Sequence, residues 1–81
     1  MKSNWQALKE EINKYKVGDF IYRKNLRIWG MSMTYVDNTR RQLTVCGYLE
    51  DTGEPGKYKL LKPLERDLTT TKLRKMYDTA F

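Results

Sequence analysis

The sequence predicts a small α+β domain, and two observations support that prediction. Apolar side chains recur at helical spacing near the start, in the middle and near the end of the chain. Between the middle and the last of these segments, two β-prone stretches flank the turn-rich segment Thr52-Gly53-Glu54-Pro55-Gly56. A chain of 81 residues is large enough for one hydrophobic core and too small for two. We therefore expect a single α+β unit.

Composition and charge narrow the possible functions. The sequence has 16 Lys and Arg against 10 Asp and Glu, a net charge of +6, which favours a polyanionic partner. It has no histidine and one cysteine, Cys46, so neither a zinc-finger ligand set nor a histidine-based catalytic triad can form. We therefore expect a protein that is not an enzyme and that binds no metal or other cofactor. No apolar run reaches the ~18 residues of a membrane helix, and residues 1–5 lack the apolar core of a secretion signal, which predicts a cytoplasmic protein that does not bind membranes.

The first predicted element is an amphipathic helix. Ser3 fits the N-cap position with Gln6 three residues on, which is the spacing of a capping box. The apolar residues that follow at helical spacing are Trp5, Leu8, Ile12 and Tyr15. The helix is expected to end before Val17, and Phe20–Tyr22 is then predicted to be a short strand.

A second, short helix is predicted after this strand. It is expected from Arg23 to Trp29, barely two turns, with Leu26 and Trp29 three residues apart on its apolar side. Gly30 supplies the permissive backbone that ends a helix.

The segment from Ser32 to Leu49 fits two periods, and the helical one is favoured. As a helix, it has its apolar residues on one side, namely Val36, Leu43 and Cys46. Thr34 and Asp37 have the S/T-x-x-D/E spacing of a helix start. Gly47 fits the C′ position, with Tyr48 placed to contact Leu43.

The alternative is a pair of strands. Residues 34–36 and 43–45 would then flank a turn at Asp37-Asn38, and their Thr, Tyr and Val residues favour sheet. This interpretation leaves residues 40–42 as a loop without turn residues, so we prefer the helix.

The last part of the chain predicts a β-hairpin followed by a helix. Residues 48–51 and 57–61 can pair across the turn, and Pro63 closes the second strand. Residues 67–70 lead into a short helix whose apolar residues are Leu73, Met76 and Tyr77. We divide the chain into a domain of residues 1–64 and a tail of residues 65–81. The expected core consists of Trp5, Leu8, Ile12, Phe20, Leu26, Trp29, Val36, Leu43, Leu49 and Leu60.

The predicted order of elements is helix, strand, helix, helix and hairpin. With the segment Thr34-Tyr35-Val36-Asp37-Asn38-Thr39-Arg40-Arg41-Gln42-Leu43 and the exit Cys46-Gly47-Tyr48-Leu49, the chain resembles the winged-helix members of the helix-turn-helix group, of small bacterial or phage type. The resemblance extends from Trp5 to Pro63 and leaves the tail outside the common core. It implies a winged-helix fold and a small transcriptional regulator that binds double-stranded DNA in a sequence-specific manner. In such a protein the third helix lies in the major groove and the wing contacts the flanking backbone.

The third predicted helix carries the candidate base-reading residues. Its outward line at i, i+4 and i+7 consists of Thr34, Asn38 and Arg41, and the next member is the apolar Val45. Asn is suited to adenine and Arg to guanine, which makes Asn38 and Arg41 candidates for reading base edges. Ser32 and Thr34 at the helix start are expected to hold a phosphate, and Gln42 belongs to the same candidate set. For each residue, an ordinary solvated surface is the alternative.

Basic residues outside this helix are expected to contact phosphates. Arg23 and Lys24 lie on the second helix, which borders the groove in the proteins that the chain resembles. Lys57 and Lys59 alternate on the second wing strand and therefore share a face. The same hairpin carries the acidic residues Glu50, Asp51 and Glu54. Their charge opposes phosphate binding and keeps open a winged-helix module that contacts proteins, such as an inhibitor or adaptor.

Two further possibilities remain open at this stage. One is a small all-β barrel that binds RNA or single strands, with Tyr35, Tyr48 and Tyr58 as stacking surfaces. The other concerns the tail, whose apolar strip of Leu73, Met76 and Tyr77 either mediates a homodimer or packs on its own domain.

Overall fold

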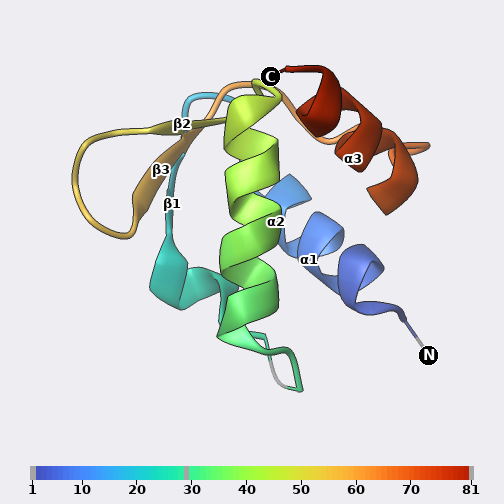
Figure 1. Ribbon diagram of the computed structural model, residues 1–81. Helices are drawn as coiled ribbons and strands as arrows, with labels where there is room; N and C mark the ends of the chain where they lie inside the picture. Colours follow the sequence, from blue (N-terminus) through green and yellow to red (C-terminus); the bar gives the residue numbers. More distant parts are fainter. Residues whose placement is uncertain (1, 29, 81) are drawn as a thin grey trace.

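The computed structural model describes residues 2–28 and 30–80 of the chain. Within them the elements are α1 (Asn4–Asn13), β1 (Phe20–Tyr22), the 3-10 helix η1 (Arg23–Leu26), α2 (Met33–Val45), β2 (Leu49–Asp51), β3 (Lys57–Leu60) and α3 (Thr70–Thr79). In Figure 1, α2 stands upright in the centre, with the β2–β3 hairpin on its left and α3 on its right. The predicted α+β class is confirmed, and the strand interpretation of residues 34–45 is wrong because this segment is one continuous helix.

The sheet is antiparallel with the order β1-β3-β2, so β3 is the central strand. Its inner face, which packs on the core, pairs Ile21 with Tyr58 and Leu49 with Leu60. Its outer face carries the alternate residues, which are Phe20, Tyr22, Glu50, Lys57 and Lys59. The hairpin strands match the predicted ones to within a residue at each end.

One hydrophobic core joins all the elements. Its buried members are Leu8, Ile12, Ile21, Leu26, Met31, Val36, Leu43, Tyr48, Leu49, Leu60, Leu64, Leu68 and Leu73. Phe20, which we expected in the core, is instead 47% exposed, because Ile21 takes the inward position of this three-residue strand. Trp5 is half-buried at the edge of the core, and Trp29 lies outside the described residues.

Local hydrogen bonds explain where the helices begin and end. Ser3 and Gln6 form the predicted capping box at the start of α1. The start of α2 differs from the prediction, because the hydroxyl of Ser32 accepts from the backbone N–H of Tyr35 and Thr34 lies inside the first turn. At the other end of α2, Gly47 has a φ of +88°. The backbone N–H groups of Gly47 and Tyr48 donate to carbonyls of the last turn, as in a Schellman motif.

The second helix is shorter than the sequence predicts. Only the four residues Arg23–Leu26 are helical, and they form a 3-10 helix. Leu26 is the one residue of η1 that is buried, so a single apolar side chain anchors this turn to the core. The backbone of Arg27, with φ −82° and ψ 89°, has already left helical geometry, so the helix ends after one turn.

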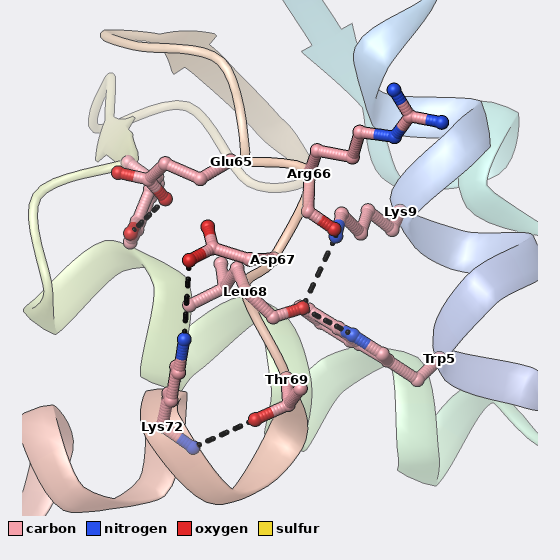
Figure 2. Close-up of polar contacts among 9 residues, drawn as sticks. Trp5, Lys9, Glu65, Arg66, Asp67, Leu68, Thr69 and Lys72 are labelled. Carbon is pink, nitrogen blue, oxygen red and sulfur yellow. Dashed lines mark hydrogen bonds and ion pairs between the residues drawn. The ribbon is translucent and has the colours of Figure 1, made fainter.

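The tail is tied to α1 by side chains that bind backbone carbonyls (Figure 2). The indole Nε1 of Trp5 donates to the carbonyl of Leu68 at 3.0 Å. The ammonium of Lys9 donates to the same carbonyl at 3.1 Å and to that of Arg66 at 2.7 Å. The hydroxyl of Tyr48 adds a hydrogen bond to Glu65. Residues 65–79 therefore pack on the domain, and α3 lies against α2.

None of the helices in the described part of the chain is both long enough and apolar enough to cross a membrane.

Candidate nucleic-acid interface

The outward surface of α2, which we define as Thr34, Asn38 and Arg41, is fully on the solvent side of the helix. All three residues are exposed, and the next member of the line, Val45, is exposed as well. Val36 and Leu43 lie on the opposite side in the core. The two faces of α2 therefore follow the helical period that the sequence predicts.

Within the described residues, the side chains on this surface make no hydrogen bond and no ion pair, and Arg41 acts on Asp37 only through the field of its charge. Asn38, Arg41 and the neighbouring Gln42 make no side-chain hydrogen bond or ion pair with any other described residue. Their amide and guanidinium groups therefore keep their hydrogen-bonding capacity for an external ligand. Ser32 differs, because its hydroxyl oxygen already accepts from the backbone N–H of Tyr35 at 3.1 Å.

The adjacent arginines of α2 point in different directions. Arg40 turns toward the sheet, where its guanidinium lies 4.6 Å from the ring centroid of Tyr58. Arg41 is one residue further along the helix and points to solvent. Of the two, only Arg41 is placed to contact a ligand on the outward surface.

On the η1 side of α2, a basic residue is already paired. Arg23 donates to both carboxylate oxygens of Asp37, with each nitrogen 2.9 Å from its acceptor. The hydrogen bond from Arg23 holds the pKa of Asp37 below its usual value, and the same contact raises the pKa of Arg23. Lys24 is exposed, with its ammonium 5.8 Å from the ring centroid of Tyr22. The positive charge of Arg23 is therefore largely balanced, whereas Lys24 keeps its own.

The structure does not bring Lys57 and Lys59 to the outward surface of α2. The two lysines share a face as expected, but it is the outer face of the sheet, opposite to the core and α2. The ammonium of Lys57 lies 4.3 Å from the ring centroid of Phe20 and 3.7 Å from a carboxylate oxygen of Glu54. Lys59 stands opposite Glu50 in the register of β2 and β3.

A hollow lies between α2 and α3 and borders the outward surface of α2 at Asn38. Its volume is about 270 Å³, and it is lined by Tyr35, Asn38, Thr39, Gln42, Thr70, Thr71, Leu73 and Arg74. Two candidates from the sequence, Asn38 and Gln42, thus face residues of the tail. Thr70, Thr71 and Arg74 were not among the predicted site residues, because no local signal in the sequence indicates that the tail helix packs beside α2.

Other chemistry finds little support in the described residues. Tyr48 and Tyr58 are buried in the core, so they are not the stacking surfaces that the barrel alternative needs, and the three α-helices rule that alternative out.

Cys46 is half-buried, and burial raises the pKa of its thiol, which disfavours a reactive thiolate. Within residues 2–28 and 30–80, no three His, Cys, Asp or Glu side chains gather as a metal site would require.

Comparison with known proteins identifies no relative of this chain. No protein-family model matches it, and neither a curated protein nor a solved structure matches at a significant level. The function is therefore inferred from the geometry described above.

Proposed function

We propose that this chain is a winged-helix protein that binds double-stranded DNA in a sequence-specific manner, with α2 in the major groove. The observation that carries the proposal is the outward surface of α2, where Asn38 and Arg41 are exposed and make no side-chain hydrogen bond or ion pair with other described residues, on a helix whose other side is fixed in the core. At 13 residues, α2 is about 20 Å long, and the major groove admits a helix of this kind. Regulation of transcription is the role that follows from such binding.

The order of elements supports the winged-helix assignment. α1, β1, η1 and α2 precede a hairpin, and β1 completes the sheet by pairing with the second hairpin strand, β3. In the proposed arrangement η1 and α2 form the helix-turn-helix unit, and the hairpin is the wing. The short η1 is the element that departs most from a regular helix-turn-helix unit.

The side chains on α2 have distinct proposed roles. Asn38 offers an amide that can pair with the N6 and N7 positions of adenine, and Arg41 offers a fork suited to the O6 and N7 positions of guanine. Thr34, in the first turn, is placed to donate to a phosphate together with the free backbone N–H groups of the helix start. Ser32 contributes its hydroxyl proton, since its oxygen is used by the cap.

The phosphate contacts differ from the expected set. Lys24 is exposed on η1 and stays a predicted contact to the DNA backbone, although its ammonium lies nearest the ring of Tyr22 on the outer face of the sheet, whereas Arg23 is already held by Asp37. Lys57 and Lys59 lie behind the sheet relative to α2, so the proposed contact does not include them. The wing tip itself carries Glu54 and no basic residue between Thr52 and Gly56.

The test begins with selection of bound duplexes from a random pool, which supplies a preferred sequence and a scrambled control. Asn38→Ala and Arg41→Ala should each weaken binding to the preferred duplex by roughly 1 to 3 kcal/mol and change binding to the scrambled duplex little. Lys59→Ala removes the same charge as Arg41→Ala from the other side of the molecule and should leave both affinities nearly unchanged. Equal losses on the two duplexes, or none, would show that α2 does not read sequence.

A second candidate function is contact with a protein partner through the outer face of the sheet. The observation in its favour is that Phe20 and Tyr22 of β1 are 47% and 40% exposed there, and the neighbouring hairpin carries acidic residues that disfavour phosphate. An apolar interface of this kind depends weakly on salt, whereas DNA binding weakens steeply as salt rises. Binding of a protein that survives high salt and is lost in Phe20→Ser would support this candidate.

A further inference from the structure

We infer that α3 takes part in the same DNA contact, with Arg74 binding the phosphate strand beside the groove that α2 occupies. This inference rests on the proposed function and extends it to the tail, which lies outside the region of family resemblance. It assigns the flanking backbone contact to α3 and not to the lysines of the hairpin.

The chemistry of the hollow between α2 and α3 supports an anionic occupant. Asn38 and Gln42 line it from α2, and Thr70, Thr71 and Arg74 line it from α3. The polar groups of these side chains are amides, hydroxyls and one guanidinium. No carboxylate is among the eight residues that line the hollow. A phosphate therefore meets hydrogen-bond donors there and no opposing charge.

Arg74 is the basic residue of α3 that is turned toward α2. Leu73 beside it is 1% exposed and fixes the orientation of the helix. Lys72 is paired with Asp67 at 3.2 Å, and Lys75 lines a separate hollow with Met76 near the end of α3. Arg74 is exposed and forms no ion pair within the described part of the chain.

The general dimensions of packed helices and of DNA support this contact, since α3 packs against α2. Packed helices have axes about 8 to 10 Å apart, and the major groove is about 12 Å wide. With α2 in the groove, a helix packed at its side lies over the phosphate strand that borders the groove. Arg74 is therefore near a phosphate, and its planar fork can bind two phosphate oxygens at once.

The experiment compares Arg74→Ala with Lys75→Ala, which remove one positive charge each from adjacent positions on α3. The probe is a random-sequence duplex of about 20 base pairs, because a phosphate contact does not depend on sequence. Arg74→Ala should lower affinity about five- to tenfold at 0.1 M salt and reduce the slope of log K against log salt by about 0.9. Lys75→Ala should leave the slope unchanged, and Arg74→Lys should restore it.

The outcomes separate this inference from the proposed function. If the wild-type chain shows no salt-dependent duplex binding, the proposed function is wrong and the role of Arg74 falls with it. If the wild type binds and Arg74→Ala has the same slope as Lys75→Ala, only the inference about α3 is overturned. Arg74 is exposed, so the variant should keep the wild-type unfolding transition, and that measurement excludes misfolding as the cause of any loss.

Discussion

The outward surface of α2 and the outer face of the sheet both carry basic side chains. The charge on α2 is free to bind a ligand, whereas the charges on the sheet lie beside aromatic rings and carboxylates. Arg41 on α2 has no ion-pair partner within the described part of the chain. On the sheet, Lys57 lies across Phe20 and beside Glu54, and its side chain is only 21% exposed. A count of Lys and Arg in the sequence treats these residues alike, whereas their neighbours decide which charge is free to meet a ligand.

The difference has a structural cause. On the sheet, each outer residue stands directly opposite a residue of the next strand, which places Lys59 beside both Phe20 and Glu50. On the exposed side of a helix, neighbours lie three or four residues apart, and Asp37 stands four residues before Arg41, but both of its carboxylate oxygens accept from Arg23. Among the described residues, the side chains of Asn38 and Arg41 therefore keep their hydrogen-bond donors for an external ligand.

The largest effect should come from removing the support of α2. Leu73→Ala is expected to reduce the free energy of unfolding by about 2 to 5 kcal/mol, because this buried side chain of α3 belongs to the core beside α2. The measurement is urea unfolding followed by circular dichroism. Met76→Ala is the matched control on the same helix, where the side chain is 39% exposed and the loss should be much smaller. Equal losses would mean that α3 does not support α2 in this way.

A smaller effect should follow from releasing Arg23. Asp37→Asn removes a carboxylate of α2 itself and frees Arg23 for phosphate, so affinity for any duplex should rise about fivefold at 0.1 M salt, with a steeper salt dependence. Because the pKa of Asp37 is lowered in the folded protein, the ion pair is intact above the unfolded pKa of about 4 and is lost as pH falls through the lower folded value. The gain should therefore be the same at pH 7 and at pH 6. An unchanged affinity would place the Arg23–Asp37 pair away from the DNA.

The smallest effects are expected on the outer face of the sheet. Phe20→Thr and Tyr22→Thr should change the free energy of unfolding by no more than about 0.5 kcal/mol each, since both rings are exposed and threonine favours strands. Duplex affinity should be unchanged in both variants. A clear loss of duplex binding in either variant would bring the sheet into the DNA contact and remove the distinction between the two surfaces.

Much of the fold could be predicted because its signals are local. The capping box of Ser3 and Gln6, the exit of α2 at Gly47 and the turn of the hairpin each depend on residues close in sequence. The length of the second helix and the exposure of Phe20 could not be predicted in this way. Each depends on which side chains the rest of the core accepts, and Ile21 and Leu26 take the buried positions.

The same distinction between local and tertiary signals applies to the residues of the candidate site. The exposure of Thr34, Asn38 and Arg41 follows from the period of one helix and was predicted correctly. The pairing of Arg23 with Asp37 joins residues 14 positions apart, and Arg74 approaches α2 only through tertiary packing. Whether these residues bind DNA stays a prediction until the binding experiments are done.

The hydrogen bonds between α1 and the tail have an evolutionary consequence. Trp5 and Lys9 bind the carbonyl of Leu68 directly before α3, so α1 helps to set where α3 lies beside α2 (Figure 2). In the proposed complex, α1 thereby determines the spacing between the base contacts and the flanking phosphate contact. Substitutions at these two positions would alter the width of the footprint on DNA while the base-reading side chains stay the same. In the proposed complex, binding-site length would thus change through residues of α1, outside the base-reading helix α2.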